Sequence, residues 1–248
     1  MINERLDKFW LSAEWPAPDH IHAGISLRHG GISNKPFNGL NLAKHVNDDI
    51  EAVNKNREKI KQILGIDSEP VWLNQTHSNK IISLGKLTDN FDADGSISST
   101  QKIICVVLTA DCVPLLLCNK TGTQIGAIHV GWKGLSCGII ENAVAKFSEP
   151  KSLFAWIGPN ITKQHYEVGR DVLNACVAHS EDLKNAFDPV KNNHWLCDLS
   201  KLAKIILKKC GVGAIYECGL CTYENSDLFY SYRRDGITGR NASMIWME

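Results

Sequence analysis

The sequence has no excess of charge of either sign. It carries 27 lysines and arginines against 27 aspartates and glutamates, so its formal net charge is zero. Proteins that bind nucleic acid or an anionic membrane surface normally carry a basic excess, and neither partner is expected here. Long apolar runs are also missing, since none approaches the roughly 18 residues that a membrane-spanning helix needs. We expect no membrane-embedded segment.

The first residues, MINERLDKFWLSAEW, lack the uninterrupted apolar core and the small-residue cleavage site of a secretory signal. Cysteine, in contrast, is not scarce. There are nine cysteines, an odd number, and several of them (Cys105, Cys118, Cys176) lie inside apolar runs. This is typical of reduced cysteine used as a small apolar side chain and not of a disulfide framework. The sequence therefore predicts a cytoplasmic protein.

The length of 248 residues, with 44% apolar and 22% charged residues, fits one globular domain over residues 1–248. Strand-like and helical segments alternate, which predicts an α/β or α+β fold with a mostly buried sheet. Helical spacing marks residues 48–64, 135–148, 171–178 and 199–209. Buried strands are predicted at 106–108, 113–117, 125–130, 153–158, 214–218 and 243–247. Residues 1–19 are expected to form an edge strand and a turn.

The chemistry concentrates between Cys105 and Leu135, where apolar strands break at polar residues. Cys112 precedes one strand, and His129 leads from the next strand straight into Gly131. A turn at residues 119–122 would fold these strands side by side and bring the thiol and the imidazole together. Such a pair suits either one metal ion or a nucleophile with its base, and the spacing alone does not choose between them.

His77 lies at a polar break between two further strand-like segments, so it could join Cys112 and His129 at one sheet edge. Two imidazoles and one thiolate leave the fourth position of a tetrahedral zinc ion open, which is the pattern of catalytic sites. Spacing alone is equally compatible with a buried cysteine and two hydrogen-bonded histidines. In the competing interpretation Cys112 is a nucleophile and His129 its base, oriented by Asp94 or Asp111, and His77 has no role.

A rival metal site is His165-Tyr166-Glu167 with Cys218 and Cys221, an H-x-E followed by C-x-x-C. It superficially matches the zinc deaminases of nucleobases, but the proline that precedes the first cysteine there is replaced by glutamate. Among the cationic residues, Arg28 follows a short strand beside a glycine turn, and Lys133 and Arg233 are further candidates for holding an anion. Each could equally be a solvated charge or part of a local ion pair.

Several motifs together resemble one family, the bacterial laccase-domain or polyphenol oxidase-like proteins, now described as purine nucleoside phosphorylases and related to a peptidoglycan editing factor. The similar blocks, from about residue 26 to 246, are SLRHGGIS, PFNGLNL, NQTHSNKI, TADCVPLLL, GAIHVGWKGL, AWIGPNI, YEVG and CTYEN…LFYSYRRDGITGR. The resemblance implies a single domain of layered mixed β-sheets flanked by helices. It also implies one zinc ion per chain, held by His77, Cys112 and His129.

The same resemblance implies phosphorolysis of adenosine, inosine, guanosine and methylthioadenosine, together with adenosine deamination. Purine nucleosides and phosphate would then be the partners of a monomer or homodimer. The expected site residues, besides the metal ligands, are Asp94 and Asp111 with Cys112 and His129 for catalysis, and Arg28, Asn41, Lys133 and Arg233 for substrate or phosphate. Two departures from the family pattern stand out: FDADGSIS around Asp94, and lysine at Lys133 where arginine is common.

Alternatives remain open at this stage. Older descriptions of the family name copper-dependent phenol oxidation, and a Cys–His site also accommodates copper(I). A laccase-type oxidase, however, needs several coppers and many histidines in H-x-H pairs, and only His20 and His22 fit that pattern. A cysteine hydrolase or amidase acting on a peptidoglycan precursor would use Cys112 and His129 without metal. A non-catalytic metabolite-binding module would bind its ligand without turnover.

Overall fold

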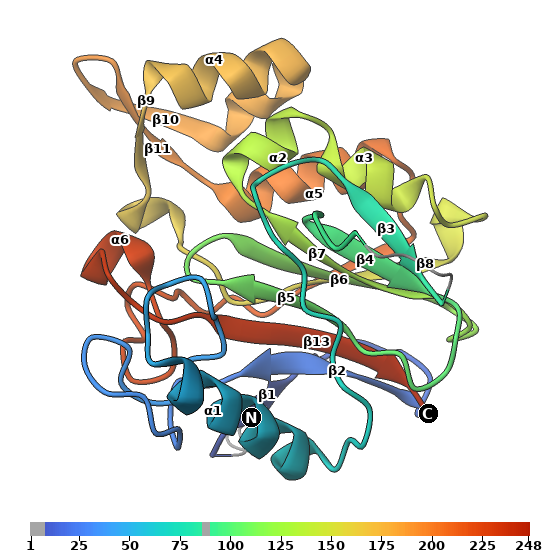
Figure 1. Cartoon of the computed structure of the whole chain (residues 1–248). Helices are drawn as coiled ribbons and strands as arrows, with labels where there is room; N and C mark the ends of the chain where they lie inside the picture. The colour runs from blue at the N-terminus through green and yellow to red at the C-terminus, as the bar shows by residue number, and fades with distance from the viewer. Residues whose placement is uncertain (1–7, 86–89) are drawn as a thin grey trace.

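Two sheets are stacked face to face at the centre of the computed structural model, which describes residues 8–85 and 90–248 (Figure 1). The six-stranded sheet runs in the order β12 (Ala214–Glu217), β8 (Leu153–Ile157), β6 (Val113–Asn119), β7 (Ile125–Val130), β4 (Gly95–Ser98) and β3 (Ile81–Leu84). Its two outer pairs are parallel and the inner pairs antiparallel. The four-stranded sheet is antiparallel, in the order β1 (Trp10–Ser12), β2 (Ile21–Ser26), β13 (Asn241–Met247) and β5 (Cys105–Thr109).

Helices cover the outer face of each sheet. The helices are α1 (Ile50–Leu64), α2 (Trp132–Ser136), α3 (Ile139–Val144), α4 (Arg170–His179), α5 (Leu199–Lys209) and α6 (Tyr232–Asp235), with 3₁₀ turns at Pro150–Ser152, Lys163–His165 and Glu181–Ala186. Figure 1 shows α2, α3 and α5 above the six-stranded sheet and α1 below the four-stranded sheet. The mixed, layered α/β fold expected from the sequence is confirmed.

The period-two alternation of the central strands explains this layering. Along β6, Leu115 and Leu117 pack with the helices, whereas Leu116 packs with the four-stranded sheet. Along β5, Val107 faces the six-stranded sheet and Val106 faces α1. Successive side chains of a strand point to opposite faces, so strands that are buried on both faces read as unbroken apolar runs. The predicted strands at 113–117 and 125–130 are confirmed by β6 and β7.

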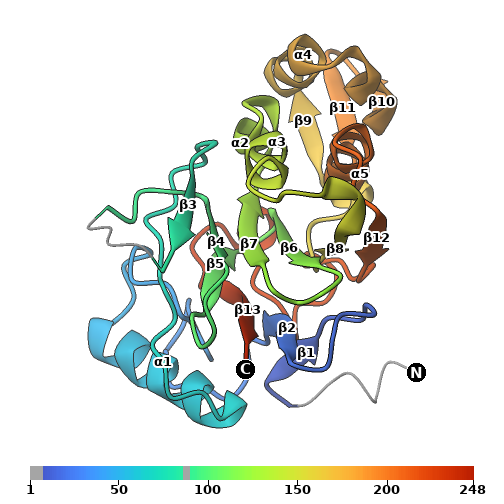
Figure 2. The same cartoon turned by 90° about the vertical axis from the view of Figure 1, so that its right-hand side faces the viewer.

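A third, smaller sheet stands apart from these layers. It consists of β10 (Phe187–Lys191), β11 (His194–Cys197) and β9 (Glu167–Gly169), all antiparallel. Figure 2 shows it with α4 at the end of the molecule remote from α1. Its strands are only three to five residues long and have no sustained apolar run, so the hydrophobic pattern did not predict them.

One predicted helix is wrong in its extent. Residues 135–148 were expected to form a single helix, but α2 begins at Trp132 and a break at Gly138 separates it from α3. Gly138 has φ +85°, a left-handed conformation that glycine adopts without steric cost and that ends a right-handed helix. The early start has a consequence for the site, since it puts Trp132 and Lys133 in the first turn of a helix that begins two residues after the end of β7.

Two further predicted elements are confirmed, and part of one of them lies outside the described residues. Helix α5 covers the predicted range 199–209, and the edge strand expected within residues 1–19 is β1. Residues 1–7 of that opening lie outside the described part of the chain. Each of the nine cysteines is a free thiol. No helix among the described residues is both long and apolar enough to cross a membrane.

Candidate metal centre and substrate cavity

Three side chains that the sequence singles out meet at one end of the six-stranded sheet. Cys112 lies directly before β6, and His129 is near the end of β7, its antiparallel neighbour, with Pro114 opposite His129. The loop before β3 brings His77 to the same end. The Sγ atom of Cys112 and Nε2 of His77 are 3.9 Å apart, and one donor atom from each of the three residues lies within 4.8 Å of the others. Hairpin pairing thus juxtaposes residues distant in sequence.

The donor set fits one metal ion with an open coordination position. Tetrahedral zinc, with bonds of about 2.0 Å to nitrogen and 2.3 Å to sulfur, would place these nitrogen and sulfur atoms about 3.6 Å apart. The backbone leaves room for this arrangement only because residue 131 is glycine. A Cβ atom on Gly131 would lie 2.9 Å from Cδ2 of His77 and 3.0 Å from Sγ of Cys112. Imidazole and thiolate ligands suit zinc and also copper(I).

Asp94 lies behind the two histidines and orients both. Its carboxylate is fully buried, and Oδ1 accepts hydrogen bonds from Nδ1–H of His129 at 2.8 Å and from the backbone N–H of His77 at 3.0 Å. A proton on Nδ1 leaves the Nε2 lone pair of His129 free to bind a metal, as in carboxylate–histidine–metal arrangements. Asp94 precedes β4, which pairs with β7, so the sheet itself fixes the carboxylate beside His129.

The loop that carries His77 is wrapped around the same carboxylate. Oδ2 of Asp94 accepts from the backbone N–H groups of Thr76 and Ser78 and from the Ser78 hydroxyl, at 3.2, 2.6 and 2.7 Å. His77 has φ +59°, a left-handed conformation that costs a non-glycine residue about 1–3 kcal/mol and persists only where its surroundings impose it. The three successive N–H donors around Asp94 impose it here.

These contacts also decide the charge of Asp94. Burial alone would raise the pKa of the carboxyl group, but hydrogen bonds from His129 and Ser78 outweigh it and bring the pKa to about 2. Both oxygens are occupied by donors, so the group is held as a carboxylate. Gln75 secures the loop from the other side, since its side-chain amide both donates to O and accepts from N–H of Leu108 in β5.

Cys112 and His129 form a strongly coupled pair. Burial raises the pKa of the Cys112 thiol, but the charge of His129 and hydrogen bonds from both imidazoles outweigh it and lower the pKa to about 6. Burial lowers the pKa of His129, but the Cys112 thiolate and the Asp94 carboxylate outweigh it and raise the pKa to about 9. The site therefore favours a thiolate, which is the form of cysteine that binds metal and the form that acts as a nucleophile.

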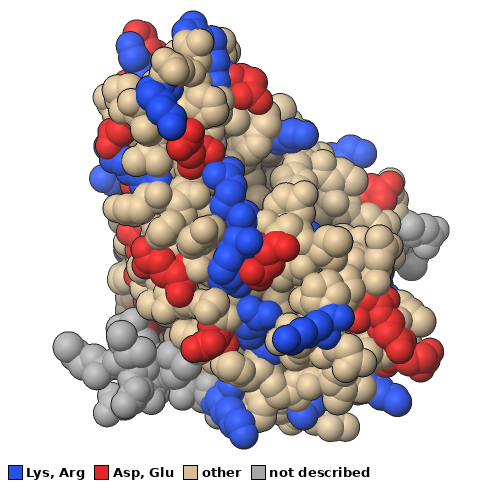
Figure 3. Space-filling model, turned by 90° about the vertical axis from the view of Figure 1, so that its left-hand side faces the viewer, with Lys and Arg blue, Asp and Glu red and all other residues tan. Residues whose placement is uncertain are grey.

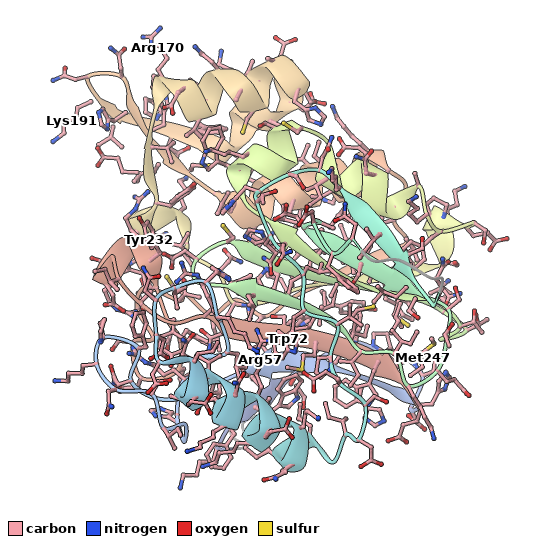
Figure 4. All side chains as sticks on the ribbon, in the orientation of Figure 1. Arg57, Trp72, Arg170, Lys191, Tyr232 and Met247 are labelled. Atoms are coloured by element: carbon pink, nitrogen blue, oxygen red, sulfur yellow. The ribbon has the colours of Figure 1, made fainter. Side chains whose placement is uncertain are left out.

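A cavity of about 520 Å³ opens in front of the three donors. Aromatic and cationic side chains dominate its wall. Besides His77, Cys112 and His129, the lining residues are His45, Gln75, Leu108, Thr109, Ala110, Asp111, Trp132, Lys133, Tyr166, Tyr232, Arg233 and Arg240. Figure 4 labels Tyr232 on α6, next to the end of the stacked sheets. Figure 3 views this side of the molecule and shows lysine and arginine gathered down the middle of the face.

Arg233 and Asp111 belong to one wall of this cavity. The Arg233 guanidinium lies 4.9 Å from the centre of the Tyr166 ring and donates to the carbonyl of Glu167 at 2.9 Å. Asp111 accepts the backbone N–H of Arg233 on Oδ2 at 2.6 Å and the hydroxyl of Thr222 on Oδ1 at 2.7 Å. Both of its oxygens are occupied, as in Asp94, so Asp111 ties α6 to the turn that carries Cys112.

Asn41 lies behind the cavity and not in its lining. It is fully buried, and its Oδ1 accepts the backbone N–H of Arg240 at 3.0 Å, while its Nδ2 donates to Asp48 at 2.8 Å. Burial lowers the pKa of Arg240. Sequence reasoning missed Arg240 and His45 as cavity residues. The signal was present, since Arg240 ends the RDGITGR block and His45 closely follows GLNL.

Arg28 is not brought to the three donors. It lines a separate cavity of about 570 Å³, where its guanidinium lies 4.7 Å from the centre of the Tyr230 ring and donates to the carbonyl of Ser226 at 2.8 Å. The rival H-x-E and C-x-x-C site is not assembled as predicted. Glu167 pairs with His194 instead, whereas His165 and Cys221 do approach each other, together with Glu224.

Comparison with known proteins places the chain in a family. Residues 22–248 match the family described as multi-copper polyphenol oxidoreductase laccase. The chain belongs to this laccase-like family. Two relatives are named purine nucleoside phosphorylase: the protein from Pseudomonas aeruginosa is 39% identical over 96% of this chain and 98% of its own length. The Escherichia coli relative YfiH is 39% identical over 94% of this chain and 97% of its own length.

Solved members of the laccase-like family share the fold over nearly the whole chain. The crystal structure of a Neisseria meningitidis protein superposes with a TM-score of 0.91, at 41% identity, over 97% of this chain and 100% of that protein. A hypothetical protein from Bacillus licheniformis superposes with a TM-score of 0.89, at 30% identity, over 98% and 97% of the two chains. The family resemblance seen in the sequence motifs is confirmed.

Proposed function

We propose that this protein is a metal-dependent purine nucleoside phosphorylase whose metal is one zinc ion at His77, Cys112 and His129. The observation that carries the proposal is the convergence of these three donors on an open cavity, with Asp94 fixing His77 and His129 together. Relatives that carry this activity in their names match over almost their whole length. A bound zinc ion would supply Lewis-acid chemistry at its open position.

The cationic wall of the cavity suits phosphate. Phosphorolysis joins a phosphate oxygen to the anomeric carbon of the ribose while the bond from that carbon to the purine nitrogen breaks. Arg233, Arg240 and Lys133 would hold the phosphate dianion, since guanidinium and ammonium groups are its usual partners. The rings of Trp132, Tyr166 and Tyr232 offer surfaces for the purine. Adenosine, inosine, guanosine and methylthioadenosine are the proposed substrates.

Asp94 and Asp111 act as positioning residues in this proposal. A group that shuttles protons must reach the substrate and change its protonation state near neutral pH. Asp94 has a pKa of about 2 and accepts hydrogen bonds on both oxygens, and Asp111 is tied to Thr222 and Arg233. Deamination of adenosine at the same site would therefore draw its proton carrier from another group, such as His45, which lines the cavity.

The second candidate is a cysteine hydrolase, which the low pKa of Cys112 favours. Thiolate, imidazole and carboxylate stand in the order Cys112, His129, Asp94, which is the order of a nucleophile, its base and the orienting group. His77 supports the metal-dependent candidate. A thiol hydrolase needs no second imidazole, yet the chain holds His77 in a left-handed conformation 3.9 Å from the sulfur.

The test pairs elemental analysis of metal with phosphate-dependent release of adenine and hypoxanthine from adenosine and inosine. For Cys112→Ala we expect the loss of about one equivalent of zinc and of base release. Cys137→Ala is the matched control, because Cys137 is exposed and lies outside the cavity. Turnover by a metal-free wild-type protein would overturn the proposal in favour of the hydrolase. Phenol oxidation that requires copper would favour the oxidase.

A further inference from the structure

A second group of metal-ligand side chains lies behind the wall of the cavity. His165 ends the 3₁₀ turn Lys163–His165, and Cys221 and Glu224 lie on the segment that leads to α6. One donor atom from each residue lies within 4.8 Å of the others. Among the described residues, this trio and His77–Cys112–His129 are the groups of such side chains that approach to this extent.

The backbone holds the two segments together at this point. Asn160 and Cys221 form a parallel bridge, and the N–H of Thr222 donates to the carbonyl of Asn160 at 3.1 Å. A turn follows, in which the N–H of Asn225 donates to the carbonyl of Cys221, and it carries Glu224 back toward His165. Figure 1 shows the 3₁₀ turn Lys163–His165 beside α6. Residues 59 positions apart in sequence are thus fixed side by side.

The sulfur and the imidazole are both oriented by contacts outside the trio. Sγ of Cys221 accepts hydrogen bonds from the hydroxyl of Thr162 at 3.1 Å and from its backbone N–H at 3.4 Å. Donors directed at sulfur complement the negative charge that it carries as a metal ligand. The His165 ring is stacked on Tyr223 with the ring centres 4.4 Å apart and the planes inclined by 10°.

The three side chains of the trio differ in solvent exposure. Cys221 is 2% exposed, while the His165 and Glu224 side chains are 29% and 56% exposed. The sulfur is therefore fixed, the other two ligands can adjust, and solvent offers an entry path. His165 Nε2 and Glu224 Oε1 are now 2.8 Å apart. Tetrahedral zinc would separate such nitrogen and oxygen atoms to about 3.3 Å, which is a small movement for two partly exposed side chains.

We propose that His165, Cys221 and Glu224 form a second metal site, for zinc or a similarly thiophilic divalent cation. Nitrogen, sulfur and carboxylate oxygen are all zinc ligands, and water would complete the coordination. The ion would fasten the Thr162–His165 segment to the Cys221–Glu224 turn. Both segments lead directly into the cavity wall, since Tyr166 follows His165 and Thr222 donates to Asp111. A metal ion bound there would stabilise the cavity wall by cross-linking these two segments.

The experiment uses the full chain with Cys112→Ala, which removes the thiolate of the first site. Cobalt(II) is the probe, because a cysteine ligand gives it a thiolate charge-transfer absorption band. We expect this variant to bind cobalt(II) with that band and to unfold at a higher temperature in zinc, since a ligand that binds only the folded state stabilises it. Adding Glu224→Gln, a change at an exposed side chain, should weaken cobalt(II) binding by about tenfold or more.

Two further variants make the outcome decisive. Adding His165→Gln to Cys112→Ala should abolish both the absorption band and the zinc-dependent rise in unfolding temperature. Adding Cys218→Ser instead should change neither, because Cys218 is the other cysteine of the C-x-x-C motif but is not in the trio. Cobalt(II) binding that survives Glu224→Gln and His165→Gln unchanged, or is absent from Cys112→Ala, overturns the proposal.

Discussion

Two cavities in this protein have similar volumes and each is lined by two arginines, yet they differ in the other side chains that line them. The cavity of about 520 Å³ holds Arg233 and Arg240, and the one of about 570 Å³ holds Arg28 and Arg234. In the second, Arg234 donates to both oxygens of Asp235, at 2.9 and 2.8 Å, and also to backbone carbonyls.

Arg28, the other arginine of the second cavity, is stacked on Tyr230 and donates to a backbone carbonyl. Both guanidinium groups of that cavity are thus held by the fold, and so are those of Arg233 and Arg240, which lie over Tyr166 and Tyr232 and donate to backbone carbonyls. The first cavity differs because it contains three convergent metal-ligand side chains, and a buried carboxylate holds the ring of one of them, His129, and the backbone of another, His77. Volume and arginine count thus do not distinguish a catalytic site from a structural crevice. The distinguishing feature is a set of metal-ligand nitrogen and sulfur atoms that are held close to one another.

Removing His77 should abolish the distinction between the two cavities. We expect His77→Ala to lose zinc and to lower phosphate-dependent base release by about 100-fold or more, because the ion loses one of three ligands. Metal content and initial rates on inosine are the measurements. His194→Ala is the control, since His194 is half-exposed and pairs with Glu167 outside the cavity. A metal-free His77→Ala enzyme with full activity would support the thiol hydrolase.

Replacing Asp94 tests the carboxylate that orients the imidazole of His129 and holds the backbone of His77. Asparagine replaces one of the two acceptor oxygens by an NH₂ group, which cannot accept the hydrogen bond from either Ser78 or His129, so Asp94→Asn should weaken zinc affinity by about 10–100-fold. Competition with a chelator measures that affinity. Asp92→Asn is the matched control, because Asp92 is exposed and accepts from the side chain of Asn74. Equal zinc affinity in Asp94→Asn and wild type would contradict the orienting role.

The lowered pKa of Asp94 predicts a pH dependence of the free energy of unfolding, which the same pair of variants tests. The pKa of Asp94 lies near 2 in the folded protein, below its ordinary value of 3.8. A lowered pKa stabilises the folded state by about 2 kcal/mol at pH values above about 4, and this stabilisation is lost as the pH falls toward 2. Urea unfolding of the metal-free proteins between pH 2 and 7 should show wild type gaining on Asp94→Asn across this window, and Asp92→Asn following wild type.

A smaller effect is expected at the cavity wall that we propose to bind phosphate. Arg233→Gln removes the guanidinium that lies over Tyr166 but keeps the backbone N–H that donates to Asp111. We expect the KM for phosphate to rise about tenfold, in line with the loss of one charged hydrogen-bond donor, while zinc content stays unchanged. Steady-state kinetics at varied phosphate is the measurement. A fall in kcat with KM unchanged would instead place Arg233 at the reacting atoms.

The smallest effect belongs to the second cavity. Arg28→Gln should leave the KM for phosphate within about twofold of wild type, because Arg28 does not line the cavity that contains His77, Cys112 and His129. The variant should lose the stacking on Tyr230, which contributes about 1 kcal/mol to stability, and the hydrogen bond to the carbonyl of Ser226. Parallel kinetics and urea unfolding measure the two quantities. A tenfold rise in KM would mean that phosphate uses the Arg28 cavity after all.

Much of the fold was predictable because the central strands and long helices carry strong local patterns. The apolar runs of β6 and β7 and the helical spacing of residues 199–209 each give one answer. The short β9–β11 sheet was not predictable, since its strands, such as FDPVK, lack that pattern. Its pairing depends on tertiary contacts.

The site divides in the same way. His77, Cys112 and His129 each stand at a strand end or polar break, so their meeting at one edge could be anticipated. The separation of Arg28 from Arg233 could not, because each follows an ordinary polar motif and only the folded chain shows which cavity it enters. Asn41 illustrates a further limit. Its motif resembles a binding block, yet it supports Arg240 from behind through one backbone hydrogen bond.

The position of β13 has a consequence for how the molecule is made. Strands β2 and β5 do not pair with each other; each pairs with β13, which follows every other strand in the sequence. When His77, Cys112 and His129 have been synthesised, the nascent chain still lacks β13, the strand that joins β2 to β5 in the four-stranded sheet. Arg233 and Arg240 arrive just before that strand. Assembly of the cavity thus waits for synthesis of β13, and a metal ion that needs the finished site would bind only after that strand has paired.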